Sequence, residues 1–178
     1  MIRIGILGDI GSGKTYVAKS FGYPVFDADK EVAKLYKSNK KIFVQLKKVL
    51  PKYIISFPIR KGEVLKSILA NPLNLKKIIK IVHKEVRKKM NLFLLKNKNK
   101  RIVILDIPLL LENKINKKGD ILVFVKSNKK DILKRLKKRP GFNYNLFIKF
   151  KKIQLPLDYK MKKSHFIIKN NFTNKSVK

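Results

Sequence analysis

The 178-residue sequence contains no cysteine, two histidines and only 11 acidic residues. The lack of cysteine excludes disulfides and thiolate metal sites, and two histidines leave little material for a dedicated zinc site. No apolar stretch approaches the roughly 20 residues that a membrane-spanning helix needs. The apolar run at the N-terminus is too short and wrongly flanked for a signal peptide. We therefore expect a cytoplasmic protein with no membrane partner.

Acidic residues are heavily outnumbered by 45 lysines and arginines, which gives a formal net charge of +34. Such an excess normally suggests a nucleic-acid partner. Here the lysines are spread along nearly the whole chain, and neither a localised basic stripe nor an aromatic-studded sheet motif is visible. We interpret the charge as a chain-wide substitution bias and expect no specific nucleic-acid partner, although phosphate contacts favour incidental RNA binding.

One motif stands near the N-terminus, directly after an apolar run, Ile2 to Leu7, that is typical of a buried strand. It matches the phosphate-binding pattern G-x-x-x-x-G-K-[ST] and consists of Gly8, Asp9, Ile10, Gly11, Ser12, Gly13, Lys14 and Thr15. Its glycines let backbone N–H groups point at a triphosphate, Lys14 reaches the outer phosphates, and the Thr15 hydroxyl can ligate Mg²⁺. A helix beginning near Lys14 adds the positive end of its dipole.

A glycine-rich turn without a ligand would explain the glycines of this loop, but it would not explain a Lys-Thr pair placed just there. We therefore expect ATP and Mg²⁺ as the cofactors.

The remaining apolar patterns predict an α/β fold. Strands are predicted over 2–7, 24–27, 101–106, 120–125 and 165–168, and helices over 29–36, 40–49, 61–69, 73–95, 129–138 and 144–153. This alternation implies a three-layer sandwich with a five-stranded parallel sheet, as in P-loop kinases. We expect one domain over 1–178, with a core at about 1–36 and 100–170, a helical insertion at about 37–99 and a polar tail at 171–178.

Two acids follow predicted strands. Asp29 comes just after the second strand, so its carboxylate is expected at the carboxyl edge of the sheet, where ligands of open α/β folds bind. There it could take the proton of an attacking hydroxyl. Asp27 or Asp29 could in addition cap the following helix, because one carboxylate can do both. Asp106 ends the third strand, where P-loop enzymes often place an acid near Mg²⁺, and a turn-capping role explains it nearly as well.

Two pairs of basic residues show helical spacing. Arg135 and Arg139 lie four residues apart on a predicted helix and are expected to share a face, just before the breaker Pro140-Gly141. They could close over the transferring phosphoryl group, while in so basic a chain any given arginine is more often a solvated surface residue. His83 and Arg87 repeat the spacing on the long helix, where a lone histidine is more often structural than functional.

Together these residues resemble the dephospho-CoA kinase family, which phosphorylates the ribose 3′-hydroxyl of dephospho-coenzyme A with ATP, the last step of coenzyme A biosynthesis. Matching segments run nearly end to end: GDIGSGKT, GYPVFDAD, NPLNLKKIIKIVHKEVR, ILDIPLLLE, DILVFV, KRLKKRPG, IQLPLDYK and FIIKNN. The resemblance implies that Asp29 is the general base, that Lys14 and the loop amides hold ATP, and that Arg139 belongs to a closing lid at about 139–150.

The resemblance also assigns the acceptor side. It implies that the insertion carrying His83 and Arg87 is the CoA-binding subdomain. The residues implied to line the acceptor site are Pro108, Leu109, Leu110 and Glu112. The partner is then dephospho-CoA as a small-molecule substrate, and we expect a monomer or a weak homo-oligomer.

The chain departs from the family pattern at four places. Asp9 and Phe150 stand where glycine and arginine are usual, Lys84 replaces the proline after His83, and Ser164-His165 replaces an alanine-aspartate pair. A carboxylate at Asp9 is unfavourable beside phosphates unless it points away. The lysines that flank Phe150 do not replace a bidentate arginine equivalently.

Two other functions are open to the sequence. Another P-loop nucleoside or nucleotide kinase would share the loop and the lid, but Asp-Ala-Asp and Pro-Leu-Leu-Leu-Glu argue against it. A nucleotide-dependent RNA-binding protein has only the charge in its support.

Overall fold

The computed structural model describes residues 1–173, which form two compact units. The first unit consists of Met1–Ala28 and the chain from Leu94 onward, and the second consists of Asp29–Phe93. Most of the predicted polar tail, residues 174–178, lies outside the described residues.

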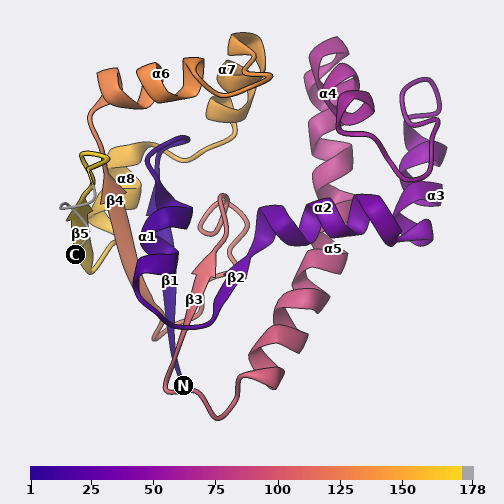
Figure 1. Cartoon of the computed structure of the whole chain (residues 1–178). Coiled ribbons are helices and arrows are strands. Elements are labelled where there is room, and N and C mark those ends of the chain that lie inside the picture. The colour runs from indigo at the N-terminus through magenta and orange to yellow at the C-terminus, as the bar shows by residue number, and fades with distance from the viewer. Residues whose placement is uncertain (174–178) are drawn as a thin grey trace. The chain divides into compact units, whose positions relative to one another are not determined.

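The first unit is built on a five-stranded sheet in the order β2-β3-β1-β4-β5 (Figure 1). Its strands are β1 (Ile2–Gly8), β2 (Val25–Asp27), β3 (Ile102–Asp106), β4 (Ile121–Lys126) and β5 (Phe166–Lys169). Every neighbouring pair is parallel, so all carboxyl ends meet at one edge. The predicted strands and the parallel sheet are confirmed.

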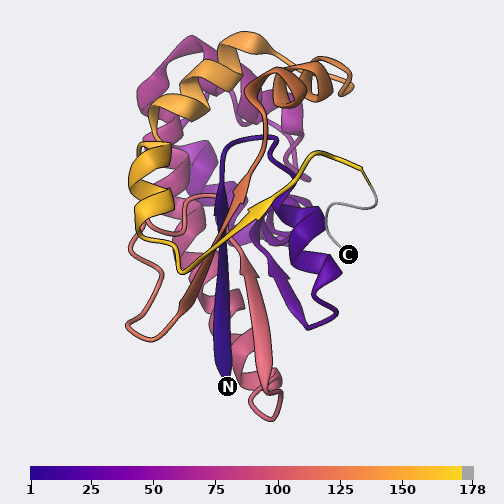
Figure 2. The same ribbon diagram turned by 90° about the vertical axis from the view of Figure 1, so that its left-hand side faces the viewer.

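Helices cover both faces of this sheet, as Figure 2 shows for α1 (Lys14–Ser20) and α8 (Leu157–Lys162). On one face, Val17 and Ala18 of α1 pack in a buried core that includes Ile6 and its neighbours on the other strands. On the opposite face, a Cβ added to Gly5 would lie 2.5 Å from the Leu110 side chain, so the loop after β3 packs directly on the β1 backbone. The two-sided burial explains why the central strands read as continuous apolar runs.

Two further helices of this unit begin at asparagine caps. The Asn128 side chain accepts from the Lys130 N–H at 2.8 Å at the start of α6 (Lys129–Lys137), and Asn143 accepts from the Leu146 N–H at 3.0 Å at the start of α7 (Tyr144–Lys152). Such caps satisfy N–H groups that have no partner within the helix. The sequence analysis did not predict α8, which begins directly after Pro156.

The second unit is helical throughout its regular structure. Its elements are α2 (Ala28–Ser38), which starts one residue before the unit boundary, α3 (Lys40–Val49), α4 (Lys61–Ala70) and α5 (Pro72–Lys96), whose end lies in the first unit. The buried residues of α5 recur at helical spacing and include Ile78, Val82, Val86 and Met90, which confirms the predicted amphipathic helix. Burial raises the pKa of Tyr36 on α2 to about 12. No helix within residues 1–173 has the length and apolar character to cross a membrane.

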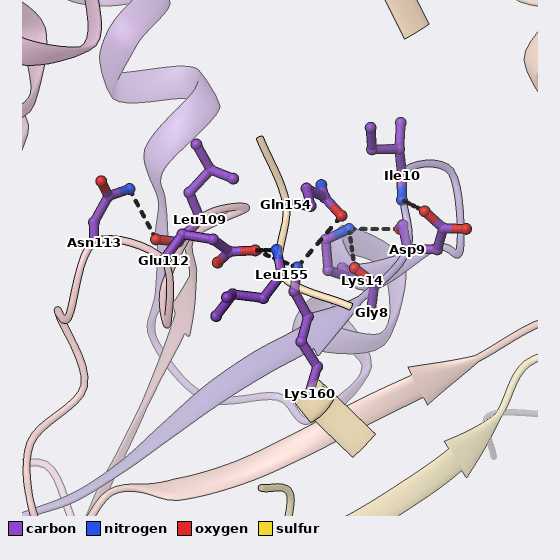
Figure 3. A network of polar contacts seen from close by, with 10 residues as sticks. All are labelled: Gly8, Asp9, Ile10, Lys14, Leu109, Glu112, Asn113, Gln154, Leu155 and Lys160. Carbon is purple, nitrogen blue, oxygen red and sulfur yellow. Dashed lines mark hydrogen bonds and ion pairs between the residues drawn. The ribbon is translucent and has the colours of Figure 1, made fainter. Parts of the chain in front are cut away.

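A buried ion pair joins α8 to the loop after β3 (Figure 3). Lys160 Nζ lies 2.5 Å from Glu112 Oε1, and the two side chains are only 1% and 9% exposed. Lys160 also lies 3.3 Å from Gln154 Oε1, and Glu112 Oε1 accepts a further hydrogen bond from the Leu155 N–H at 3.0 Å. Removing one partner of such a pair leaves an uncompensated buried charge.

We expect Lys160→Met to lower the free energy of unfolding by about 3–5 kcal/mol, because the Glu112 carboxylate loses its cation in the interior. Urea unfolding of the purified protein measures this. The double variant Glu112→Gln/Lys160→Met should recover much of the loss, and exposed Lys162→Met should stay within about 0.5 kcal/mol of wild type. A Lys160→Met protein as stable as wild type would show that the pair does not hold this face.

Candidate active site

The phosphate loop connects β1 to α1 at the carboxyl edge of the sheet, as predicted. Gly8, Gly11 and Gly13 have φ angles of 146°, 83° and 90°, which side-chain-bearing residues rarely adopt. A Cβ at Gly8 would also lie 2.7 Å from the Val125 carbonyl oxygen. Because α1 begins at Lys14, its N-terminal N–H groups and the positive end of its dipole lie at the end of this loop.

The Lys14 side chain folds back across the loop (Figure 3). Its Nζ donates to the carbonyl oxygens of Asp9 at 2.7 Å and Gly8 at 3.3 Å. These two contacts hold the ammonium group over the loop.

Thr15 and Asp106 come together although they are far apart in the sequence. The Thr15 hydroxyl donates to Asp106 Oδ2 at 2.5 Å. Asp106 is buried, and burial raises its pKa, while the Thr15 hydrogen bond and the Lys14 charge act in the opposite direction.

This oxygen pair fits Mg²⁺, which binds one or two protein oxygens and completes its octahedron with phosphates and water. Residues 1–173 contain no group of three or more His, Cys, Asp or Glu side chains able to hold a metal ion. Phosphate and water oxygens would therefore have to supply the remaining ligands.

The unusual Asp9 has partners on both carboxylate oxygens. Oδ1 accepts from the Ile10 N–H at 2.7 Å, and Oδ2 lies 4.0 Å from Nζ of Lys151 on α7. The residue is only 6% exposed. The loop therefore accommodates the carboxylate by pairing it with an amide and a lysine.

Residues from later strands support the back of the loop. Asn170, after β5, and Ser127, after β4, each donate to the Ser12 carbonyl oxygen at 3.0 Å. Asn170 is buried, and a Cβ at Gly13 would clash with its side-chain amide. Sequence reasoning missed both residues, although the place of Asn170 directly after the last strand was a usable signal.

Helices α6 and α7 pack on the tip of the loop. Ile132, Leu136 and Phe147 form a buried cluster, and Ile10 packs against it. A Cβ at Gly11 would lie 3.1 Å from both Ile132 and Leu136. The predicted lid region is therefore in contact with the phosphate loop in this structure.

The expectation that Arg135 and Arg139 share a helix face is wrong. Helix α6 ends at Lys137, and Arg139 lies in the following turn, where its N–H donates to the Leu136 carbonyl at 3.0 Å. The helix ends because Pro140 cannot continue it. The Arg135 guanidinium instead lies 4.0 Å from the centroid of the Phe172 ring.

The implied acceptor segment forms a turn after β3. Leu110 is fully buried, whereas Pro108 and Leu109 are half-buried. Glu112 Oε1 pairs with Lys160, while its Oε2 is buried and has no hydrogen-bond partner among the described residues.

The second unit carries the other expected residues. Asp29 lies in the first turn of α2, two residues after Asp27, which is the register partner of Asp106 on β3. Because two residues of chain span at most about 7 Å, the Cα atom of Asp29 lies within about 7 Å of that of Asp27. His83 and Arg87 lie one turn apart on α5, and partial burial together with the Arg87 charge lowers the His83 pKa.

The sheet, the loop and the Thr15–Asp106 pair define a P-loop nucleotide-binding protein. Solved structures agree with this fold. TT1252 from Thermus thermophilus aligns over 99% of this chain and 92% of its own, with a TM-score of 0.77 and 26% identity. The dephospho-CoA kinase from Campylobacter jejuni covers 96% of this chain and 89% of its own, with a TM-score of 0.60 and 20% identity.

The sequence comparisons name the family. The sequence profile of dephospho-CoA kinase matches residues 2–176. The dephospho-CoA kinase of Wolbachia pipientis is 34% identical over 98% of this chain and 91% of the relative, and that of Zymomonas mobilis is 30% identical over 96% and 88%. The chain belongs to the dephospho-CoA kinase family and is a phosphotransferase. The predicted family, fold and enzyme class are confirmed, and the roles of single residues stay predictions.

We expect His83 to titrate below its ordinary pKa of 6.5, so that it is neutral at pH 7. Arg87→Ala should raise the His83 pKa only in part, because burial, the larger cause, remains. NMR titration of the imidazole resonances measures both values. A wild-type midpoint above 6.5, or no response to Arg87→Ala, would contradict this assignment.

Proposed function

We propose that this chain transfers the γ-phosphoryl group of ATP to the ribose 3′-hydroxyl of dephospho-CoA. The family match over residues 2–176 is the observation that carries this proposal. The enzyme would act on a small-molecule substrate in the cytoplasm, without a specific nucleic-acid or membrane partner, as a monomer or weak homo-oligomer.

The loop would bind the triphosphate through its backbone N–H groups and Lys14. An ammonium group carries three donors, and Lys14 directs donors to the Gly8 and Asp9 carbonyls. Because these contacts already order the side chain, Lys14 would lose little side-chain entropy on binding the outer phosphates, which supports the proposed role. Arg135 would contribute to the nucleotide site from α6.

Thr15 and Asp106 would hold Mg²⁺ with the phosphates. When bound, the ion neutralises charge on the β- and γ-phosphate oxygens. The hydrogen bond between them supports this role, because it brings two oxygen atoms that can ligate a metal ion to within 2.5 Å of each other.

Asp29 would act as the general base. In the proposed step the 3′-oxygen forms a bond to the γ-phosphorus, its proton passes to the Asp29 carboxylate, and the bond to the bridging oxygen breaks so that ADP leaves. The short connection from β2 supports this role, because Asp29 follows Asp27 by only two residues.

The acceptor would be held by His83 and Arg87 from the helical insertion and by the segment Pro108–Glu112, with Pro108, Leu109, Leu110 and Glu112 as the implied contacts. A neutral His83 would suit hydrogen bonding to a hydroxyl or amide, and the exposed Arg87 would suit a phosphate. Arg139 would stabilise charge on the transferring group from the segment 139–150.

We expect Asp29→Asn to lower kcat by about 10²-fold or more, the usual contribution of a general base. The assay supplies ATP, Mg²⁺ and either dephospho-CoA or a nucleoside panel, and follows ADP and the phosphorylated product. Lys14→Ala is the control that removes the charge at the phosphates and should abolish transfer to any acceptor. Near-normal turnover of Asp29→Asn would remove that role, and phosphorylation of nucleosides alone would overturn the acceptor.

Arg139→Ala should reduce kcat by about 10²-fold while changing the KM for ATP little, because it acts on charge that develops during transfer. Steady-state kinetics at saturating dephospho-CoA separate the two parameters. A change in KM alone would count against a role in the chemical step.

A further inference from the structure

A negative charge lies where this enzyme must bind a polyanion. Lys14 is the residue that reaches the β- and γ-phosphates in a loop of this pattern, and its Nζ lies 2.7 Å from the Asp9 carbonyl oxygen. The main chain of Asp9 therefore lies beside the position of the outer phosphates, which keeps its carboxylate within one side-chain length of that position. A carboxylate there opposes ATP binding unless a cation compensates for it.

The cation that faces Asp9 comes from α7. Lys151 Nζ lies 4.0 Å from Asp9 Oδ2, longer than a hydrogen bond, and the Lys151 side chain is 45% exposed. Such a half-exposed contact contributes little free energy, and it is readily exchanged for a stronger partner. Asp9 itself stays anchored, since Oδ1 accepts the Ile10 N–H.

Packing brings Lys151 to the loop. Phe147 belongs to the buried cluster that Ile10 packs against, and the Lys151 ammonium lies 5.6 Å from the Phe147 ring centroid. One turn of α7 thus carries both the apolar contact with the loop tip and the cation beside it. The position of Lys151 follows from the packing of α7, with Asp9 as its nearest anion at the loop.

We propose that Lys151 is a phosphate-binding residue of the nucleotide site, and that it pairs with Asp9 until the outer phosphates of ATP replace the carboxylate as its partner. This inference rests on the proposed binding of ATP in the loop. A triphosphate carries more negative charge than one carboxylate, so it competes successfully for the lysine. The contact should favour ATP over ADP and should leave AMP binding unaffected, because only the outer phosphates lie beside Asp9.

The pair can be tested by a double-variant cycle. Lys151→Met keeps an apolar stem on Phe147 while it removes the charge, and Asp9→Asn keeps an oxygen acceptor for the Ile10 N–H. Calorimetric titration with ATP, ADP and AMP gives the dissociation constants of wild type, both single variants and the double variant. We expect Lys151→Met to weaken ATP binding about 10-fold, which is the effect of losing one charge-assisted contact. Lys151→Arg should preserve most of the affinity.

The Asp9→Asn background separates binding from structural support. If Lys151 contacts phosphate, Lys151→Met weakens ATP binding there at least as strongly as in wild type, because the lysine no longer has a competing carboxylate. If Lys151 serves only to neutralise Asp9, Lys151→Met has no further effect once Asp9 is Asn, and the proposal is overturned. Exposed Lys152→Met is the matched control on the same helix and should bind ATP as wild type does.

Two further measurements keep the outcome unambiguous. Thermal unfolding without nucleotide shows whether each variant is folded, and equal losses of ATP, ADP and AMP affinity would contradict a contact with the outer phosphates. Lys14→Ala tests the underlying site: if it leaves ATP binding intact, the proposed nucleotide site itself fails. If Lys14→Ala abolishes binding and Lys151→Met in the Asp9→Asn background changes nothing, only the role of Lys151 fails.

Discussion

The proposed function depends on one interaction above all, the attraction between the Lys14 ammonium group and a triphosphate. The Gly8 and Asp9 carbonyl oxygens accept hydrogen bonds from Lys14 and hold it over the loop. The backbone of the loop can follow this path because Gly8 has a φ of 146° and no side chain that would meet the Val125 carbonyl oxygen. A loop that anchors its own cation in this way is organised for phosphate before any ligand arrives.

The fold supplies the remaining parts through the parallel sheet. Neighbouring parallel strands end at one edge, so Asp106 from β3 meets Thr15 from α1, and Asn170 after β5 reaches the Ser12 carbonyl behind the loop. The buried Lys160–Glu112 pair ties α8 to the loop after β3. The net charge of +34 adds a long-range attraction for polyanionic substrates that salt weakens.

Much of this was predictable because the signals are local in the sequence. Continuous apolar runs marked β3 and β4, and the spacing of glycines, Lys14 and Thr15 marked the loop. The four-residue spacing of Arg135 and Arg139 was misleading, since the helix ends at Lys137. Long-range pairs such as Asp9 with Lys151 carry no local pattern, because tertiary packing alone brings α7 to the loop.

A crystal structure with Mg²⁺ and a non-hydrolysable ATP analogue would show whether the loop and Lys14 bind the triphosphate. We expect Lys14 Nζ within hydrogen-bond distance of the β- and γ-phosphate oxygens, with the Thr15 hydroxyl and the Asp106 carboxylate beside the metal ion. Phosphates bound outside the loop, with Lys14 making only its carbonyl contacts to Gly8 and Asp9, would contradict this expectation.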